Sequence, residues 1–199
     1  DLIIARFFGE KNDGTYVDIG SHHPFRFSNT AKLYKKGWSG INVDPLPGSK
    51  SLFDSTRKRD KNLEVGVGLR ASQLTYYAFN EPALNSFSED VAKRIQSELN
   101  DYHLEKEITI DVYTLDSILT EYLEPVRQID YLNIDVEGLD LEVLQSNNWD
   151  RFKPTLISIE IWDSSINSLD ENQTHKYLSA LGYELYAKTV NTVFYRLTE

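Results

Sequence analysis

Short apolar segments alternate with amphipathic segments along most of this chain. Five apolar segments have the length of buried strands, at residues 16–19, 38–43, 63–67, 129–134 and 155–161. Segments with apolar residues at helical spacing lie before and between them, at residues 2–8, 30–36, 49–59, 88–99, 139–145 and 170–181. Strands that alternate with helices form a parallel sheet with helices on both faces. The pattern therefore predicts a doubly wound α/β fold.

The end of the chain and its middle depart from this alternation. Residues 183–188 and 192–197, joined around Asn191, predict a hairpin that adds an antiparallel strand at or near the sheet edge. Residues 69–106 separate the third strand from the fourth and include a further strand at 73–79. No repeat or linker divides the chain, so we expect one domain, residues 1–199. Within it, residues 69–106 are an insertion that covers the ligand.

Composition narrows the possible functions. The 199 residues are 40% hydrophobic and 26% charged, as in an ordinary globular domain. The sequence has no cysteine, which excludes disulfides, zinc-thiolate sites and thiol nucleophiles. A net charge of -10 disfavours nucleic acid and anionic membranes as partners. No apolar run approaches the roughly 18 residues of a membrane span, and we expect a cytoplasmic protein. The chain begins at Asp1 and has no methionine, so we expect a domain cut from a longer protein.

The turn after the first strand points to an adenosine ligand. Asp18 and Gly20 stand where the first strand meets its helix, and Asp44 ends the second strand 24 residues after Gly20. In such folds a glycine turn lets the backbone approach the ligand, and an acid about 20 residues later binds the ribose hydroxyls. His22, His23 and Pro24 occupy the place where a dinucleotide site needs further glycines. A ligand with adenosine but no pyrophosphate fits better, and S-adenosylmethionine is the commonest of these.

A second acidic segment follows the fourth strand. Asp135 and Glu137 should emerge over the same crevice as Gly20, because strands one and four are expected side by side. The alternative is that these acids only favour the start of the next helix. Glu160, late in the fifth strand, is a third acid. Burying its carboxylate among apolar residues would be costly without a partner, which favours a functional role.

Other polar residues have simpler interpretations. His22 and His23 are adjacent and point apart in most conformations, so we expect one of them to be structural. Asn29 and Arg26 lie on the loop after the first strand. They could bind S-adenosylmethionine or a second, polar ligand. The basic run Arg57-Lys58-Arg59 has the composition of a solvated helix end, and the three tryptophans are expected in the core.

Together these segments resemble the FkbM-type methyltransferases, a class I family that uses S-adenosylmethionine. The resemblance rests on four stretches that run from residue 17 to residue 160. They are Val17-Asp18-Ile19-Gly20, Tyr34-Lys35-Lys36-Gly37-Trp38-Ser39-Gly40-Ile41-Asn42-Val43-Asp44, Ile134-Asp135-Val136-Glu137-Gly138 and Ile159-Glu160. Shorter matches lie at Ser28-Asn29-Thr30, Thr114-Leu115-Asp116-Ser117 and Glu142-Val143-Leu144.

The resemblance implies a class I methyltransferase fold and a site of named residues. Donor-binding residues would be Asp18, Gly20, Ser21, Asn29, Asp44 and Pro45. Asp135 and Glu137 would lie near the reacting centre, with His22 as a further candidate base. Family members are usually O-methyltransferases on sugars or on hydroxylated secondary metabolites. Pro24 and the Gly66-Val67-Gly68 segment depart from the usual class I pattern, which affects the expected path of the donor and the recognition of its adenine.

Two mechanisms fit these residues. In one, His22, Asp135 or Glu137 removes the proton of the acceptor hydroxyl. In the other, magnesium or manganese held by Asp135, Glu137 and Glu160 lowers the pKa of that hydroxyl. We favour the metal-free mechanism.

Two other classes of protein remain as alternatives. One is a non-catalytic domain that binds adenosylmethionine or a nucleotide, which would have no use for acids after the fourth strand. The other is a nicotinamide-dependent oxidoreductase, which would need the missing glycines. The plentiful tyrosines, acids and asparagines of the loops are compatible with carbohydrate hydroxyls, so a small-molecule or glycan hydroxyl is the expected acceptor.

Overall fold

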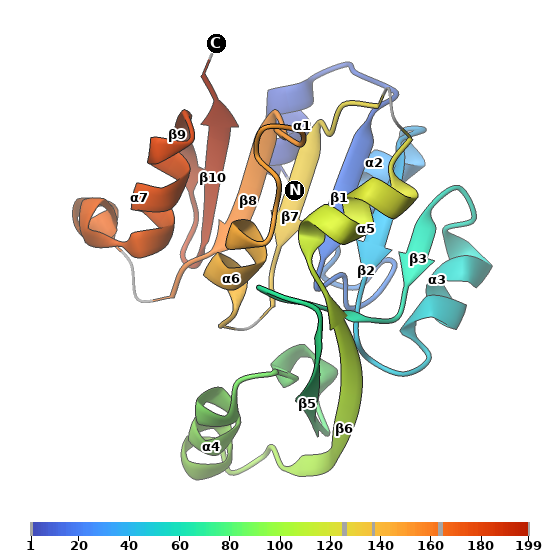
Figure 1. The fold of residues 1–199 in the computed structure, drawn as a ribbon, viewed down its shortest axis with the longest axis vertical. Coiled ribbons are helices and arrows are strands. Elements are labelled where there is room, and N and C mark those ends of the chain that lie inside the picture. The colour runs from blue at the N-terminus through green and yellow to red at the C-terminus, as the bar shows by residue number, and fades with distance from the viewer. Residues whose placement is uncertain (1, 125–126, 137, 163–164, 199) are drawn as a thin grey trace.

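The chain folds around one large twisted sheet. The computed structural model describes residues 2–124, 127–136, 138–162 and 165–198. Its larger sheet has seven strands in the order β3-β2-β1-β7-β8-β10-β9 (Figure 1). In that order the strands span Lys61–Leu63, Ser39–Val43, Thr15–Ile19, Tyr131–Ile134, Leu156–Glu160, Thr192–Leu197 and Tyr183–Lys188. β10 runs antiparallel to both of its neighbours, and the other pairs are parallel. This confirms the predicted doubly wound fold, including the adjacency of β1 and β7.

Helices cover both faces of this sheet. One face packs against α1 (Leu2–Phe8), α2 (Ala31–Lys35) and α3 (Ser49–Thr56). The other face packs against α5 (Leu115–Tyr122), α6 (Asp140–Gln145) and α7 (Gln173–Ala180). A short 3₁₀ helix, η2 (Ile166–Glu171), precedes α7. Successive residues along each strand therefore point alternately into two buried layers, one on each face of the sheet.

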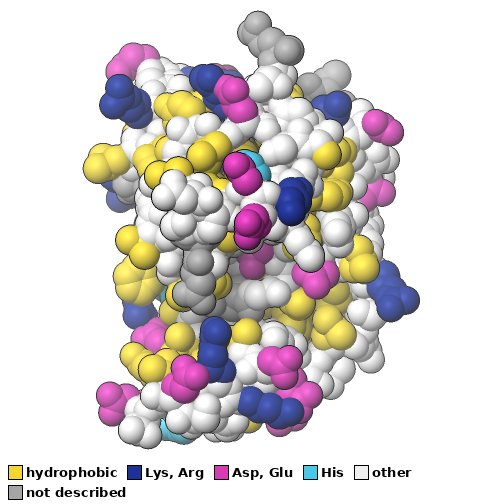
Figure 2. Space-filling model, turned by 90° about the vertical axis from the view of Figure 1, so that its left-hand side faces the viewer, with side chains coloured by type: hydrophobic (Ala, Val, Ile, Leu, Met, Phe, Trp, Pro, Cys, Tyr) yellow, Lys and Arg dark blue, Asp and Glu magenta, His cyan; other side chains and the backbone are white. Residues whose placement is uncertain are grey.

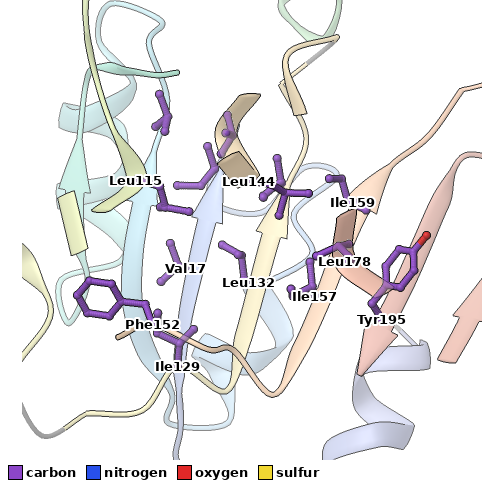
Figure 3. Packing of buried hydrophobic residues seen from close by; sticks show 14 of the residues in the cluster. Val17, Leu115, Ile129, Leu132, Leu144, Phe152, Ile157, Ile159, Leu178 and Tyr195 are labelled. Atoms are coloured by element: carbon purple, nitrogen blue, oxygen red, sulfur yellow. The ribbon is translucent and has the colours of Figure 1, made fainter. Parts of the chain in front are cut away.

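The second of these layers holds the main hydrophobic core. Its side chains come from the strands and from α5, α6 and α7, as Figure 3 shows for Val17, Leu132 and Ile157 against Leu144 and Leu178. All five are fully buried. Burial of each such side chain contributes about 2 kcal/mol. This layer fixes the order of the strands and hence the edge at which their carboxyl ends meet.

The insertion of residues 69–106 and the residues on either side of it form a smaller second sheet below the carboxyl ends of the main strands (Figure 1). Its strands, in the order β4-β6-β5, span Gly66–Val67, Leu104–Tyr113 and Ser72–Phe79. The 3₁₀ helix η1 (Pro82–Leu84) and α4 (Glu89–Glu98) connect β5 to β6. Phe79, Ala92 and Ile95 form a separate small core there.

Several local expectations were wrong. The expected third strand divides, because β3 ends the large sheet and β4 pairs with β6 of the small one. Helix α5 was not expected. Trp38 and Trp149 are buried, whereas Trp162 is half exposed. No helix among the described residues is long and apolar enough to cross a membrane.

Candidate active site

A cleft lies between the carboxyl ends of β1, β2 and β7 and the insertion. Figure 2 shows the molecule hollowed between its upper part, the large sheet, and its lower part, with acidic side chains on the rim. The cavity encloses about 220 Å³. One water needs only about 10–15 Å³ of such volume, so the cleft admits a small organic molecule. The six residues named above as donor-binding by the resemblance all line it: Asp18, Gly20, Ser21, Asn29, Asp44 and Pro45. The candidate bases His22 and Asp135 line it as well.

A row of polar side chains crosses five parallel strands behind the cleft. Each member is directly paired with the next in the sheet register: Asn62, Asn42, Asp18, Asn133 and Ser158. All five are buried. Hydrogen bonds join Asn42 to Asn62 at 2.8 Å, Asn133 to Asp18 at 2.8 Å and Ser158 to Asn133 at 2.6 Å. Buried polar groups need such partners, so the row stands as a satisfied network.

Asp18 is the charged member of this row. Its carboxylate accepts hydrogen bonds from Asn133 Nδ2 at 2.8 Å and from Thr30 Oγ1 at 2.7 Å. Burial raises the pKa of Asp18, and these two hydrogen bonds and the nearby Arg57 oppose the increase. Asp18 therefore supports the site from below as well as lining it.

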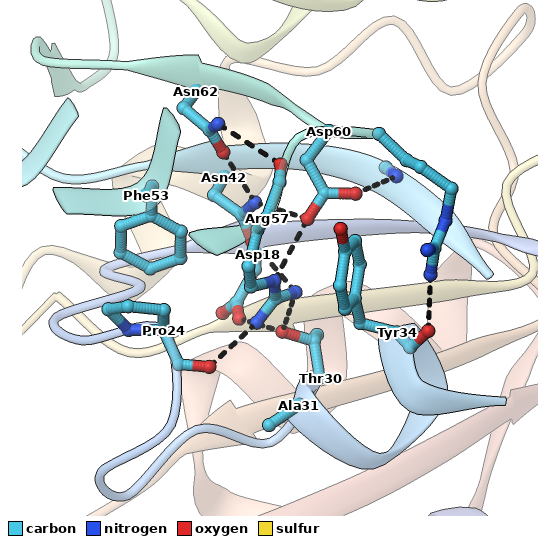
Figure 4. Close-up of polar contacts among 12 residues, drawn as sticks. Asp18, Pro24, Thr30, Ala31, Tyr34, Asn42, Phe53, Arg57, Asp60 and Asn62 are labelled. Atoms are coloured by element: carbon cyan, nitrogen blue, oxygen red, sulfur yellow. Dashed lines mark hydrogen bonds and ion pairs between the residues drawn. The ribbon is translucent and has the colours of Figure 1, made fainter. Parts of the chain in front are cut away.

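Arg57 contacts the loop of residues 21–30, which follows β1. The expectation that this arginine is solvated was wrong. Its side chain is fully buried and pairs with Asp60 at 2.9 Å (Figure 4). It also donates to Tyr16 Oη at 2.7 Å and Thr30 Oγ1 at 2.8 Å. The ion pair with Asp60 compensates a charge that would otherwise be costly to bury.

Gly20 is required by the contact between β1 and β7. Its φ is 79°, in the left-handed region. A Cβ atom there would lie 1.7 Å from the backbone oxygen of Asp135. The glycine therefore lets the turn after β1 touch the end of β7, besides keeping the backbone open toward the cleft.

Asp44 fixes the same turn from β2. Its Oδ2 accepts from the backbone nitrogen of His22 at 2.7 Å, and its Oδ1 accepts from Leu46 N at 2.9 Å. Burial raises the pKa of Asp44 to about 6 although these bonds oppose it. Each carboxylate oxygen has a second lone pair, so Asp44 can still accept from a ligand hydroxyl.

The loop from Ser21 to Thr30 contributes polar atoms without partners. Ser21 Oγ and His22 Nε2 are buried and make no hydrogen bond within the described chain. Such orphaned atoms call for a ligand or an ordered water. His23 has the expected structural role, since its Nδ1 accepts from Phe25 N and Arg26 N. Asn29 donates to Asn133 Oδ1 at 3.2 Å, which ties the loop to the polar row.

Asp135 differs from the other acids in the cleft. Its carboxyl group is partly buried and makes no hydrogen bond to another described residue. Burial, together with the negative charges of Asp140 and Asp18, raises the pKa of Asp135 to about 7. Asp140 is held by its own bonds from Val136 N and Gly138 N.

The expected metal ligands do not come together in the part of the chain that is described. Glu137 lies outside the described residues. Glu160 ends β8 and does not line the cleft. Among the described residues no group of three His, Asp or Glu side chains could hold a metal ion.

Sequence reasoning missed the opposite wall of the cleft. It is formed by Phe27 from the loop and by Tyr76, Pro82, Ala83, Asn85 and Phe87 from the insertion. Phe87 packs over Gly66, where a Cβ atom would lie 2.8 Å from its ring. Arg26 pairs with Glu81 at 3.2 Å and so connects the loop to the insertion. The position of the insertion was expected, but no local pattern identified these residues.

The strand order, the single antiparallel strand and the cleft at the carboxyl ends define a class I methyltransferase-like fold. The family model "Methyltransferase FkbM domain" matches residues 18–185, which is most of the chain. The chain therefore belongs to the FkbM methyltransferase family.

One solved structure shows a similar fold. A methyltransferase FkbM from Methylobacillus flagellatus KT is similar, with a TM-score of 0.56 and 15% sequence identity over 93% of this chain. The alignment covers 44% of that protein, so this chain spans less than half of its length. A precorrin-6y C5,15-methyltransferase from Geobacter metallireducens GS-15 aligns with a TM-score of 0.41 and 13% identity, over 92% of this chain and 78% of that one. No curated protein matches the sequence.

Proposed function

We propose that this protein is an S-adenosylmethionine-dependent O-methyltransferase whose acceptor is a hydroxyl of a sugar or glycan-related molecule. One observation carries the proposal. The ends of β1, β2 and β7 bring Gly20, Asp44 and Asp135 to one cleft, although these residues are far apart in the sequence. In open α/β sheets this edge is where ligands bind.

The cleft has groups that fit the donor. Asp44 stands at the end of β2, where an acid binds ribose hydroxyls. The unpartnered Ser21 Oγ and the backbone of Gly20 face the neighbouring stretch of the cleft. Asp18, Asp44 and Asp135 supply negative charge near a sulfonium. When bound, the donor would supply an electrophilic methyl group. Transfer of this group to the acceptor oxygen would break the S–CH₃ bond, form an O–CH₃ bond and leave the donor as a neutral thioether.

Asp135 is the residue best suited to receive the proton of the acceptor hydroxyl. A general base works best when its pKa is close to the working pH, and the pKa of Asp135 is raised to about 7. Its carboxyl group has no competing hydrogen bond from the described residues. His22 is the second candidate, since burial lowers its pKa and keeps it neutral, but its Nε2 is covered.

The opposite wall suits an acceptor with both polar and apolar faces. Phe27 is 75% exposed although it lines the cleft, so its ring is open to a ligand at the cleft mouth. Asn85 and Tyr76 add polar atoms from the insertion. Sugar rings present apolar C–H faces between their hydroxyls, which matches this mixture. We further propose that the enzyme does not act on nucleic acid, since its net charge is -10. The proposed location is the cytoplasm.

Transfer of labelled methyl groups tests the proposal. The protein would be incubated with labelled donor and a panel of nucleotide sugars, oligosaccharides and phenols, after calorimetry with S-adenosylhomocysteine. We expect donor-product binding and label in a carbohydrate hydroxyl, with activity that survives chelation. Binding of a nicotinamide dinucleotide without binding of S-adenosylhomocysteine would contradict the proposal. Loss of activity on chelation, restored by magnesium or manganese, would instead favour the metal mechanism.

A further inference from the structure

The loop from Ser21 to Thr30 contains two residues in an unfavourable backbone conformation. The φ angles are 51° at His22 and 57° at Phe27, and they are the only non-glycine residues with positive φ in the described ranges. L side chains rarely adopt this conformation, which persists only where the surroundings impose it. Both residues line the cleft, and their rings stack with centroids 6.4 Å apart. Contacts from outside the loop must therefore hold it in place.

Arg57 supplies three of these contacts. Its Nη1 donates to the backbone oxygen of Pro24 at 3.2 Å and to Ser28 Oγ at 3.3 Å. Its Nη2 donates to Thr30 Oγ1 at 2.8 Å. The three acceptors are spread over the loop, so a single planar group fixes the loop near its middle and at its end (Figure 4).

The rest of the same guanidinium is anchored on the sheet. Nε pairs with Asp60 at 2.9 Å, and Nη2 also reaches Tyr16 Oη at 2.7 Å and Asn42 Oδ1 at 3.3 Å. Asp60 in turn accepts from Gly40 N and Asn42 Nδ2. Because Tyr16 and Asn42 belong to β1 and β2, the loop is tied to the strands that carry Asp18 and Asp44. A lysine could not make this set of bonds, since its single nitrogen has no planar fork.

The contact at Thr30 continues into the site. Thr30 Oγ1 accepts from Arg57 and donates to Asp18 Oδ2 at 2.7 Å. Thr30 is fully buried, so water does not replace either partner. Arg57 itself does not line the cleft.

We infer that Arg57 is a positioning residue of the methyl-donor site, which holds the loop of residues 21–30 in its cleft-lining conformation. It acts through Pro24, Ser28 and Thr30 and does not itself line the cleft. The link from the loop to donor binding rests on the proposed function. The order of the loop in the free protein can be measured without any ligand.

Arg57→Lys tests the inference, with Arg59→Lys as the matched control. Arg59 lies two residues further on, is exposed, and donates to the backbone oxygens of Tyr34 and Trp38, away from the cleft. Hydrogen exchange of the amides of residues 21–30 would be followed in the free protein, and the Kd of S-adenosylhomocysteine by calorimetry. When only a fraction of molecules has the competent loop, the apparent Kd rises by the inverse of that fraction.

Both readouts should change together in Arg57→Lys. We expect loop amides to exchange about tenfold faster and the Kd to rise by a similar factor of about ten. The KM for the donor should rise likewise, whereas kcat at saturating donor changes by less than about threefold, because saturation restores the competent loop. Arg59→Lys should behave as the wild type in all of these measurements.

A second pair of variants covers the case in which Arg57→Lys does not fold. Thr30→Val keeps the shape and removes the hydroxyl between Arg57 and Asp18, and Thr30→Ser restores it. We expect faster loop exchange and weaker binding in Thr30→Val, with most of both losses recovered in Thr30→Ser. Wild-type loop exchange in a folded Arg57→Lys, or in Thr30→Val if Arg57→Lys is unfolded, would overturn the inference. Faster loop exchange in a protein whose wild type binds no S-adenosylhomocysteine would keep the positioning role and refute the donor instead.

Discussion

Asp18 and Asp135 stand at the carboxyl ends of neighbouring strands, yet the two ends are built differently. The end of β1 is closed: Asp18 is buried, and both of its carboxylate oxygens accept hydrogen bonds from Thr30 and Asn133. The end of β7 is open, because Asp135 is partly buried and makes no side-chain hydrogen bond within the described chain. Both carboxyl groups have a raised pKa, but for Asp18 hydrogen bonds oppose the increase.

This difference separates two tasks that acids perform in one site. A buried carboxylate whose oxygens are bonded to neighbouring side chains mainly holds those neighbours in place. A carboxylate that burial has destabilised, without bonds to compensate, gains most when it takes up a proton or binds a cation. We therefore propose that the end of β1 supports the site and that the end of β7 is the reactive one, and the following variants test that proposal.

The largest effect is expected at the open end. Asp135→Asn should reduce kcat by about 10²-fold or more, as removal of a general base does, while the affinity for S-adenosylhomocysteine, which has no sulfonium charge, changes little. In the wild type the rate should rise with pH through about 7, because the base works only when deprotonated. Asp130→Asn is the control, because Asp130 directly precedes β7, at the amino ends of the parallel strands and away from the cleft. Undiminished turnover in Asp135→Asn would remove Asp135 from the chemistry.

The next effect concerns stability at the closed end. Asp18→Ala leaves the Asn133 amide and the Thr30 hydroxyl without their acceptor, so the free energy of unfolding should fall by about 3 kcal/mol in urea denaturation. Asp18→Asn keeps the shape, and a rotated Thr30 hydroxyl can accept from the new amide, so it should cost less than about 1 kcal/mol. Equal losses in both variants would show that the charge matters more than the hydrogen bonds.

A smaller effect is expected at Asp44, which lies between the two extremes. Asp44→Ala should weaken binding of S-adenosylhomocysteine by about 1.5 to 3 kcal/mol, the range for hydrogen bonds to a charged group. Calorimetry measures the change, and Glu64→Ala is the matched control, because Glu64 caps the start of α3 and does not line the cleft. Unchanged affinity in Asp44→Ala would mean that Asp44 serves only the backbone of His22 and Leu46.

The smallest effect is the pH dependence of stability. The folded protein raises the pKa of Asp135 to about 7 and those of Asp44 and Asp140 to about 6, from about 3.9 in the unfolded chain. The folded state therefore binds more protons between pH 4 and 7, and the free energy of unfolding falls as pH rises over this range and levels off above about 7. Asp135→Asn should be more stable than the wild type by about 1 kcal/mol at pH 8, allowing for partial exposure, and similar to it at pH 4. Thermal melts at the two pH values check this, and a variant less stable at pH 8 would contradict the assigned pKa.

The large sheet was predictable because its strands are apolar runs with helices between them. The turn at Gly20 and the acids Asp44 and Asp135 were predictable for the same reason, since parallel strands all end at one edge. The buried polar row also has a signal in the sequence, which was not used to predict it. Asp18, Asn42 and Asn133 each stand one residue before the last residue of their strand.

Arg57 and the insertion wall could not be read in the same way. A basic run at a helix end is usually solvated, and only the partners of Arg57, which come from β1, β2 and the loop, show that it is buried. Phe87 packs over Gly66 of β4 and against the ring of Tyr76, and such tertiary contacts bring both residues to the cleft. Local sequence carries little information about contacts of this kind.

The close approach of Gly20 to the backbone of Asp135 has a consequence for how the protein folds. Asp18 and Asn133, which are bonded across the same pair of strands, are 115 residues apart in the chain. Contacts between such distant segments form late, because a long loop must close before they can be made. During refolding, helix content should therefore recover well before the ability to bind S-adenosylhomocysteine. A nascent chain that has not yet supplied β7 would carry the complete Gly20 turn and still have no donor site.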